Sequence, residues 1–379
     1  MFQVFWQFFK LGWVSFGGPA AHIGYFQRHF VQQLGWIPQD RFASTLALCQ
    51  FLPGPASSQL GFAIGYQRAG LGGAVAAFIG FTLPSFLLML ALALAGQAWA
   101  SQPATLVIIN GLKLFALVVV ADAVLTMAGQ FCRQRLTLTI AVLTATLLWL
   151  LSGLFAQFLA LLAAALAGAL WLRRAAGETP DQHRTIRPNW PFLLLFAGLL
   201  LVLPLLSLGG SAALFADVYQ AGSLVFGGGH VVLPLLQGLL ADRISQETFL
   251  TGYAAAQAMP GPMFTLATFL GAGLLPATPV LGALVATFGV FLPGFLLVLA
   301  LQHGWQALAA RPRLAGAVAG INAAVVGLLL AALYQPVFVA SVTGAPALAA
   351  AALGLLALRV FKCPLLVLIP AFMLSGFWL

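Results

Sequence analysis

Long apolar stretches separated by short polar connections run through most of the chain, and this pattern predicts membrane-spanning helices. About 20 apolar residues in a helix cross the hydrocarbon core of a bilayer. Such spans are expected near residues 71–97, 104–129, 136–151, 157–172, 191–208, 280–301, 314–333, 345–358 and 365–379. Two more apolar segments, 4–24 and 42–66, are interrupted by Gly17-Gly18-Pro19 and Pro53-Gly54-Pro55. We therefore expect an all-α polytopic membrane protein with broken or re-entrant helices.

The Pro-Gly-Pro interruption occurs twice, at residues 50–55 (Gln-Phe-Leu-Pro-Gly-Pro) and 257–262 (Gln-Ala-Met-Pro-Gly-Pro). Each proline removes an amide donor and pushes the preceding residue towards extended geometry, so the motif ends a helix. Unwound backbone at membrane depth is stable only where protein or water satisfies its polar groups, so such a break usually lines a cavity. Both copies are therefore expected to belong to one site.

Further matches in the same order indicate two homologous halves. Phe16-Gly17-Gly18 corresponds to Phe226-Gly227-Gly228, Pro84 to Pro293, and Asn110 to Asn322, with offsets between 207 and 212 residues. We expect a first transmembrane repeat at 1–172 and a second at 211–379. Residues 173–210 are expected to form a polar linker followed by one connecting transmembrane helix.

Composition supports the membrane assignment. Hydrophobic residues make up 62% of the chain and charged residues 6%, with a mean hydropathy of +1.04, whereas about a quarter of a soluble chain is charged. The net charge of +9 comes from basic residues in short loops, as in membrane proteins. Nucleic-acid binding would need a single basic face. The lipid bilayer is therefore an expected partner, and nucleic acid is not.

The basic residues also predict opposite orientations for the two halves. They mark the loops near residues 68 and 133–135 in the first half but those near 311–313 and 359–362 in the second. These are not equivalent loops, so the positive-inside rule gives the halves opposite topologies. Inverted repeats of this kind are typical of secondary transporters. The N-terminus is expected in the cytoplasm.

The same rule bears on the interrupted segments. Arg28 and Arg41 lie between them and would face the outer side if both segments crossed the membrane. That would violate the positive-inside rule, so the sequence favours re-entrant hairpins.

Broken helices present N-termini whose free amides and positive dipole ends attract anions. Gly17, Gly18, Gly227 and Gly228 lack a Cβ and let the backbone approach a ligand closely. The alternative is that these glycines serve only close helix packing. Two copies, each accompanied by a Pro-Gly-Pro break, favour a shared substrate site.

Lys113 is the most informative charged residue because it lies inside the span at 104–129. A lysine there costs about 2.5 to 3.5 kcal/mol on insertion scales. An ion pair with Asp122 is the alternative, but nine residues along a helix put the two on opposite faces. We expect Lys113 to contribute to an anion site. That site would be asymmetric, because no lysine occurs near Val325, the matching position.

The other candidates for substrate contact are polar or motif residues at the breaks and two aligned intramembrane amides. They are Gln50, Pro53, Gly54, Ser57, Ser58, Asn110, His230, Gln257, Gly261, Thr265 and Asn322. For His22 and His230 a hydrogen-bonded packing role is slightly favoured over proton transfer. A cation site would need inward carboxylates, yet the chain has seven acidic residues, most of them in loops. The balance of groups favours an anion.

No enzyme, metal or cofactor signature is visible. Cys49, Cys132 and Cys363 are odd in number and widely spaced, unlike a disulfide framework or a Cys/His metal site. No haem or flavin motif and no catalytic acid/base pair is recognised. We therefore expect no cofactor, no metal and no catalytic residues.

The doubled motifs resemble the chromate ion transporter family in its long, two-half form. Phe9-Lys10-Leu11-Gly12, Phe16-Gly17-Gly18-Pro19, the motif at 50–55 and their second-half counterparts carry the resemblance, which covers nearly the whole chain. It implies a bacterial inner-membrane protein that exports chromate and confers chromate resistance, driven by the membrane potential or by antiport with a coupling proton. The chain departs from the first-half pattern at Gly229, which replaces the equivalent of Pro19.

Several alternatives stay open at this point. Chromate and sulfate are both tetrahedral dianions of similar size, so discrimination between them is expected to be modest. The runner-up is therefore a transporter of sulfate or another oxyanion, including one that works in uptake. A membrane enzyme such as a chromate reductase and an uncoupled channel are the other classes. A homodimer is also left open.

Overall fold

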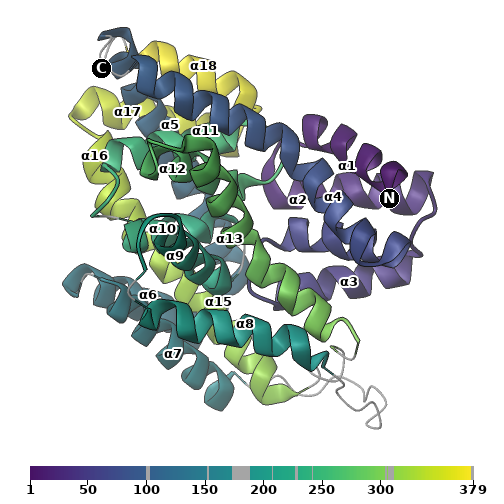
Figure 1. Cartoon of the computed structure of the whole chain (residues 1–379). Coiled ribbons are helices and arrows are strands. Elements are labelled where there is room, and N and C mark those ends of the chain that lie inside the picture. Colours follow the sequence, from purple (N-terminus) through teal and green to yellow (C-terminus); the bar gives the residue numbers. More distant parts are fainter. Residues whose placement is uncertain are drawn as a thin grey trace. The chain divides into compact units, whose positions relative to one another are not determined.

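The computed structural model describes residues 1–99, 103–151, 153–172, 188–206, 208–226, 229–240, 242–303, 305 and 311–376. Gly227, Gly228 and most of the predicted linker lie outside these residues. All the regular structure in the described part is helical (Figure 1). The helices are α1 (Phe2–Val14), α2 (Gly18–Phe26), η1 (Gln27–Gln33), α3 (Gln39–Phe51), α4 (Ala56–Trp99), α5 (Pro103–Phe131), α6 (Arg135–Leu150), α7 (Leu154–Trp171), α8 (Trp190–Val202), η2 (Leu203–Leu205), α9 (Gly210–Leu224), η3 (Gly229–Val231), α10 (Val232–Leu240), α11 (Gln246–Ala258), η4 (Met263–Thr265), α12 (Leu266–Leu274), α13 (Pro279–Leu301), α15 (Pro312–Ala332), η5 (Leu333–Phe338), α16 (Val339–Ser341), α17 (Ala345–Arg359) and α18 (Leu365–Ser375).

The predicted helix breaks are confirmed. α1 ends at Val14, and α2 begins at Gly18 after Gly17, whose φ of 97° suits glycine. α3 ends at Phe51, and α4 begins at Ala56. α1, α2 and α3 have 13, 9 and 13 residues, or about 14 to 20 Å each, less than the roughly 30 Å of the hydrocarbon core. None of the three can cross a bilayer alone, which fits the re-entrant prediction but does not test it.

The predicted full spans are also found as helices. Four stretches in the described chain are long and apolar enough to cross a membrane: Ala56–Gly96, Val107–Phe131, Pro279–Leu301 and Pro312–Ser341. The first is kinked at Ala69 and Gly70, next to the predicted span start at 71. The other predicted spans form shorter apolar helices of 10–17 residues. The prediction of an all-α polytopic membrane protein is therefore confirmed.

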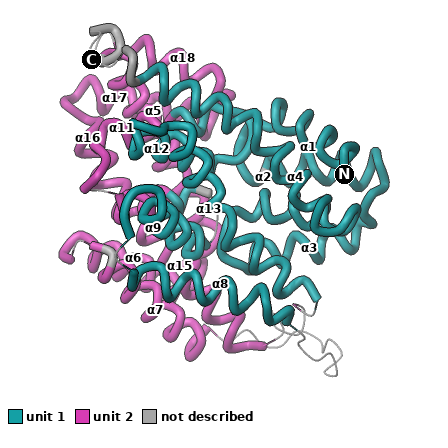
Figure 2. Tube along the Cα trace, in the orientation of Figure 1, with its two compact units in different colours: residues 1–99, 187–232, 255–303 teal, residues 100–186, 233–254, 304–379 magenta. Residues whose placement is uncertain are grey.

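The chain forms two compact units, and each combines segments from both halves (Figure 2). Unit 1 comprises Met1–Trp99, Arg187–Val232 and Ala255–His303. Unit 2 comprises Ala100–Ile186, Leu233–Ala254 and Gly304–Leu379. The boundary between them falls inside α11, so this helix belongs partly to each.

In unit 1 the two halves use equivalent contacts. α1 packs against α4, and a Cβ at Gly12 would lie 3.0 Å from Pro84 Cγ. α9 packs against α13, and a Cβ at Gly222 would lie 3.1 Å from Pro293 Cγ. Gly12 and Pro84 align with Gly222 and Pro293 in the sequence. The repeat therefore preserves a helix-packing contact as well as a motif.

Unit 2 is built around α15, which packs against α5, α6 and α7. Small residues let the backbones approach closely: a Cβ at Gly320 would collide with the Ala164 carbonyl and lie 3.1 Å from Gly168 Cα. Small residues are typical of interfaces between membrane helices, where packing replaces the hydrophobic effect.

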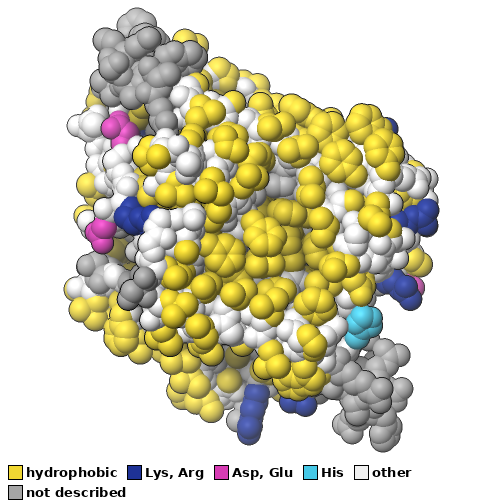
Figure 3. Space-filling model, in the orientation of Figure 1, with side chains coloured by type: hydrophobic (Ala, Val, Ile, Leu, Met, Phe, Trp, Pro, Cys, Tyr) yellow, Lys and Arg dark blue, Asp and Glu magenta, His cyan; other side chains and the backbone are white. Residues whose placement is uncertain are grey.

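Large apolar side chains remain exposed along α4 and α13. They include Leu71, Val75 and Ile79 on α4, and Leu284 and Phe288 on α13. Figure 3 shows hydrophobic side chains over most of the visible face, with few charged groups among them. An apolar exterior of this extent is stable in lipid and not in water.

We expect Gly320→Val to destabilise the protein, because its side chain would force apart α7 and α15. Overpacking of this kind costs about 1 to 3 kcal/mol. The measurement is the free energy of unfolding in mixed detergent micelles. Gly198→Val on α8 is the matched control, because nothing lies within 4 Å of a Cβ there. Equal stability of the two variants would contradict the proposed packing.

Candidate functional site at the paired helix breaks

The two Pro-Gly-Pro breaks in unit 1 exchange backbone hydrogen bonds with the opposite half. The Gly54 amide donates to the Val225 carbonyl over 2.7 Å, and the Gly261 amide donates to the Ser15 carbonyl over 2.9 Å. Ser15 and Val225 precede the two Gly-rich breaks at equivalent positions. The exchange is therefore reciprocal, and each half satisfies unwound backbone of the other, as backbone at membrane depth requires.

Glycine is required at the centre of each break. Gly54 and Gly261 have φ angles of 118° and 94°, a region that side chains disfavour. A Cβ at Gly54 would lie 3.0 Å from Gly294 Cα, and one at Gly261 would lie 2.9 Å from Ser85 Oγ. The backbone amides of Gly54 and Gly261 already donate to carbonyls of the other half. These glycines can therefore shape a site and hold the halves together.

A buried histidine ties the first Gly-rich break to the first Pro-Gly-Pro break. His22 is 1% exposed, with Nε2 3.2 Å from the Ser15 carbonyl and Nδ1 3.2 Å from Ser57 Oγ. A carbonyl only accepts, so Nε2 carries a proton, and in the neutral ring Nδ1 accepts from the Ser57 hydroxyl. This is the hydrogen-bonded packing role predicted for His22.

The second half makes a similar link from a position that is not equivalent. The Gln257 side-chain amide lies 3.4 Å from His230 Nδ1, which accepts from it, and 2.6 Å from Met263 Sδ. His230 belongs to η3 and Gln257 to the last turn of α11. Both halves thus connect their two breaks through a histidine.

Several buried polar atoms near the first break have no hydrogen-bond partner among the described residues. They include Ser15 Oγ, Ser58 Oγ and Gln59 Oε1. Gln59 Nε2 is engaged, donating to the Pro53 carbonyl over 2.8 Å and to the Gly294 carbonyl over 3.2 Å. Orphaned buried polar atoms are rare because they are costly. Ser58 is 4% exposed and sits in the first turn of α4, where the amides lack intrahelical partners.

The remaining candidates in unit 1 lie in varied surroundings. Gln50 is exposed at the end of α3, and the Thr265 hydroxyl donates to the Pro262 carbonyl over 2.8 Å. Gly17 and Gly18 both have positive φ, and a Cβ at Gly18 would meet nothing within 4 Å. Gly227 and Gly228 lie outside the described residues. The hydrogen bonds described above thus connect the motifs at Gly54, Ser57, Gln257 and Gly261. Gln50 is exposed and does not take part in them.

The intramembrane charge expected at Lys113 lies in unit 2 and is paired. Lys113 Nζ lies 2.7 Å from Glu247 Oε1 and 3.3 Å from Asn110 Oδ1. Asp122 pairs instead with Arg359, at 3.5 Å, as its position on another face of α5 requires. Glu247 was not among the predicted site residues, because it lies 134 positions away and in an apparent loop.

The two aligned asparagines differ in their surroundings. Asn110 is exposed on α5 and accepts from Lys113. Asn322 lies on α15, and its Oδ1 is buried with no partner among the residues the structure describes. The two asparagines are therefore aligned in the sequence but lie in different environments.

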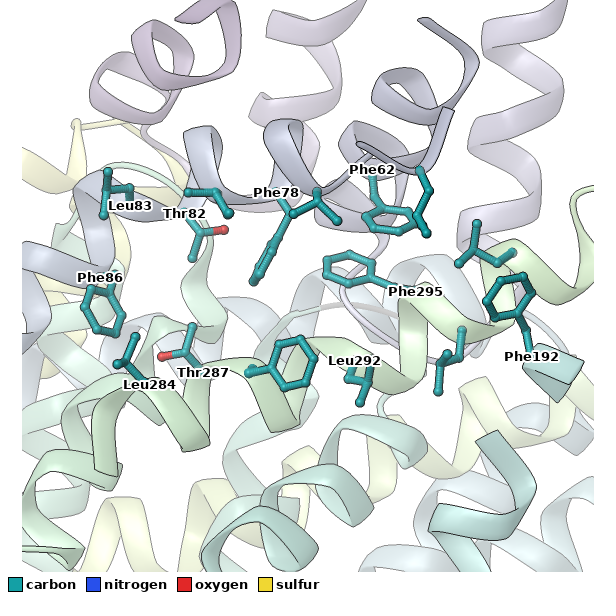
Figure 4. A pocket seen from close by; sticks show the side chains of 16 residues that line it. Phe62, Phe78, Thr82, Leu83, Phe86, Phe192, Leu284, Thr287, Leu292 and Phe295 are labelled. Atoms are coloured by element: carbon teal, nitrogen blue, oxygen red, sulfur yellow. The ribbon is translucent and has the colours of Figure 1, made fainter. Parts of the chain in front are cut away.

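A cavity of about 460 Å³ lies between α4 and α13 (Figure 4). The rings of Phe62, Phe78 and Phe295 pack together in it, with Phe62 and Phe295 stacked at 4.2 Å. Hydroxyls enter its lining at Thr82 and Thr287. An apolar space cannot compensate the desolvation of a dianion, so this cavity is a poor candidate for an oxyanion.

Unit 2 contains a more polar cavity of about 600 Å³. Its lining includes Gln157, Gln237, Gln335, Trp149 and Asp242, from both halves of the chain. Gln157 Nε2 lies 3.5 Å from the Pro234 carbonyl. These glutamines were missed because they carry no motif and only the fold brings them together.

Comparison with known proteins decides the family. The family model described as "Chromate transporter" matches residues 2–169 and again residues 212–377. The chain belongs to the chromate transporter family. The double match also confirms the predicted repeat, and the family together with the apolar spans identifies a multi-pass membrane protein.

The chain is also similar to individual family members. It is 30% identical over 352 residues to a chromate transport protein of Pseudomonas aeruginosa, covering 86% of this chain and 79% of that protein. It is 30% identical over 341 residues to a chromate transport protein of Cupriavidus metallidurans, covering 87% and 81%. An uncharacterized transporter of Methanocaldococcus jannaschii is 29% identical over 307 residues, covering 78% and 74%. No solved structure matches the chain.

We expect Gly261→Ala to lower the free energy of unfolding by about 1 to 3 kcal/mol, because it combines a left-handed φ with overpacking against Ser85. Unfolding in mixed micelles provides the measurement. Gly24→Ala in α2 is the control: its Cβ would meet nothing within 4 Å, and alanine favours a helix. A Gly261→Ala protein as stable as the wild type would argue against the reciprocal backbone exchange.

Proposed function

We propose that this chain exports chromate, or a closely related tetrahedral oxyanion, across the bacterial inner membrane and so confers chromate resistance. Membership of the chromate transporter family supports the substrate class, as do the printed names of the relatives from Pseudomonas and Cupriavidus. The observation that carries the proposal is the reciprocal pairing of the breaks, which gathers unwound backbone from both halves beside the orphaned hydroxyls of Ser15 and Ser58 in unit 1.

The oxyanion site lies at the start of α4 in this proposal. The first-turn amides of α4 point their N–H groups at the break, where the helix dipole favours negative charge. The buried Ser58 hydroxyl has no partner among the described residues and can donate to an anion oxygen. Ser57 is oriented by His22. Gly17 and Gly18 leave space for close backbone approach because no Cβ projects from them.

The repeats at 1–172 and 211–379, joined by the segment 173–210, provide alternating access in this proposal. They have inverted topology, with the N-terminus in the cytoplasm, and related rearrangements of the two repeats at the paired breaks open the site to each side in turn. The alternation of basic loops along the sequence supports the inversion. Re-entrant hairpins at the breaks would keep the site near the middle of the membrane.

Electrostatics favours export. An inside-negative potential of 100 mV contributes about 2.3 kcal/mol per elementary charge, hence about 4.6 kcal/mol for moving a dianion outwards. Uptake of the same dianion would have to overcome that energy through coupled cations. A coupling proton in antiport can add to the driving force, but the potential alone gives the direction.

Everted membrane vesicles that contain the protein are expected to accumulate chromate. Accumulation is expected to fall when the electrical gradient is collapsed, and sulfate added with chromate measures selectivity. The chromate flux is measured with the proton and electrical gradients collapsed separately. Sulfate uptake in right-side-out vesicles, with no accumulation in everted ones, would contradict the proposed substrate and direction.

Ser58→Ala is expected to raise the KM for chromate by about tenfold to a hundredfold, since a hydrogen bond to a charged group contributes about 1.5 to 3 kcal/mol. The measurement is the concentration dependence of the initial flux in the same vesicles. Ser223→Ala is the matched control, because Ser223 is also buried, at 3% exposure, but its hydroxyl donates to the Tyr219 carbonyl over 2.8 Å. Equal KM values for the two variants would place the site elsewhere.

A further inference from the structure

We propose that a substrate oxyanion binds Lys113 by displacing Glu247, so that Glu247 acts as a resident competitor for the substrate. This inference rests on the proposed oxyanion transport and concerns a contact in unit 2, which is described separately from the breaks. Lys113 Nζ and Glu247 Oε1 are 2.7 Å apart. A carboxylate is the nearest protein analogue of a tetrahedral oxyanion in charge and in oxygen acceptors.

The unequal burial of the two partners determines which one can leave. The Lys113 side chain is 14% exposed and the Glu247 side chain 43%. In this proposal the pair faces a water-filled pathway, as intramembrane charges typically do, so a separated Glu247 can turn into water and be solvated at low cost. Lys113 has no such route and would remain as an uncompensated charge in a mostly buried place. An anion that takes the place of Glu247 removes that penalty.

The donor geometry leaves a place for such an anion. An ammonium has three N–H donors, and Lys113 directs two of them to Asn110 Oδ1 at 3.3 Å and Glu247 Oε1 at 2.7 Å. Asn110 lies one helical turn before Lys113 on the same face of α5. Asn110 can hold the Lys113 ammonium in place while an oxyanion replaces Glu247.

The position of Lys113 within α5 makes its charge relevant to a crossing anion. α5 begins at Pro103, so Lys113 lies about 15 Å along the helix at a rise of 1.5 Å per residue. It is therefore inside the apolar stretch Val107–Phe131. Ionisable groups at such depth are costly and typically line substrate pathways.

α11 connects this ion pair to the second Pro-Gly-Pro break. Glu247 lies in the first turn of this 13-residue helix, and Gln257 lies in its last turn, beside His230.

The exchange pair combines Lys113 of the first half with Glu247 of the second and is not repeated. The positions equivalent to Glu247 and Lys113 are Asp40 and Val325, so the acidic residue is repeated but the lysine is not. Because the repeats are inverted, a lysine that occurs in only one of them places the exchange on one side of the substrate pathway.

The Asp122–Arg359 pair provides an internal control on the same helix. Its atoms are 3.5 Å apart, and the side chains are exposed to similar extents, 33% for Asp122 and 38% for Arg359. Both partners can be solvated when separated, so an anion gains little by replacing Asp122. An exposed pair of this kind contributes little to stability.

The test measures binding of radiolabelled sulfate, with chromate as competitor, to the full-length protein in lipid nanodiscs. Glu247→Gln is expected to tighten binding about fivefold to tenfold, equivalent to about 1 to 1.4 kcal/mol for loss of the competing ion pair. Asp122→Asn is expected to leave binding within about twofold of the wild type. In a Lys113→Met background, Glu247→Gln is expected to have no effect.

A second measurement uses the wild-type protein and so does not depend on folding of a variant. Labelling of carboxylates by a water-soluble carbodiimide is followed by mass spectrometry. Sulfate is expected to increase labelling of Glu247 and to leave Asp122 unchanged. Wild-type protein that binds sulfate with unchanged Glu247 labelling, or a Glu247→Gln protein that binds no more tightly, would overturn the competitor role while leaving oxyanion transport intact. Failure of every form to bind either anion would overturn transport and competitor role together.

Discussion

The cost of unpaired backbone in a membrane is the constraint on which unit 1 depends. Two Pro-Gly-Pro motifs unwind their helices and free polar groups where water is scarce. The bonds from Gly54 to Val225 and from Gly261 to Ser15 satisfy this requirement reciprocally. Each break is satisfied by the other half, so these bonds form only when the two halves assemble together. The requirement for glycine at both positions follows from the same close approach.

In the proposed transport, an anion is bound by polar groups that carry no large net charge. In unit 1 the available groups are helix-terminal amides and hydroxyls such as Ser58, which can stabilise a dianion without the cost of burying a cation. In unit 2 the lysine inside α5 is neutralised by Glu247. The cavity between α4 and α13 is lined by aromatic rings and is chemically distinct from both places. The proposed oxyanion site and this apolar cavity are thus different places within unit 1.

The helix packing is repeated in the two halves, but the polar side chains are not. Gly12 and Gly222 make equivalent contacts with Pro84 and Pro293, so the helix packing is repeated. The histidine links are not, because His22 bonds to Ser57 whereas His230 bonds to Gln257. Lys113 has no counterpart. The two halves thus share residues that pack against backbone and differ in these polar side chains.

The sequence by itself determined the helical class, the repeat and the positions of the breaks. These properties are local: apolar length predicts spans, proline and glycine end helices, and the motifs at 50–55 and 257–262 can be aligned without a structure. His22 as a hydrogen-bonded residue was also predictable. Only the tertiary structure decided the partners, such as Glu247 for Lys113 and Val225 for Gly54, and the assembly of each unit from both halves. Contacts between residues more than a hundred positions apart depend on how helices pack, and the periodicity of a single chain carries no record of that packing.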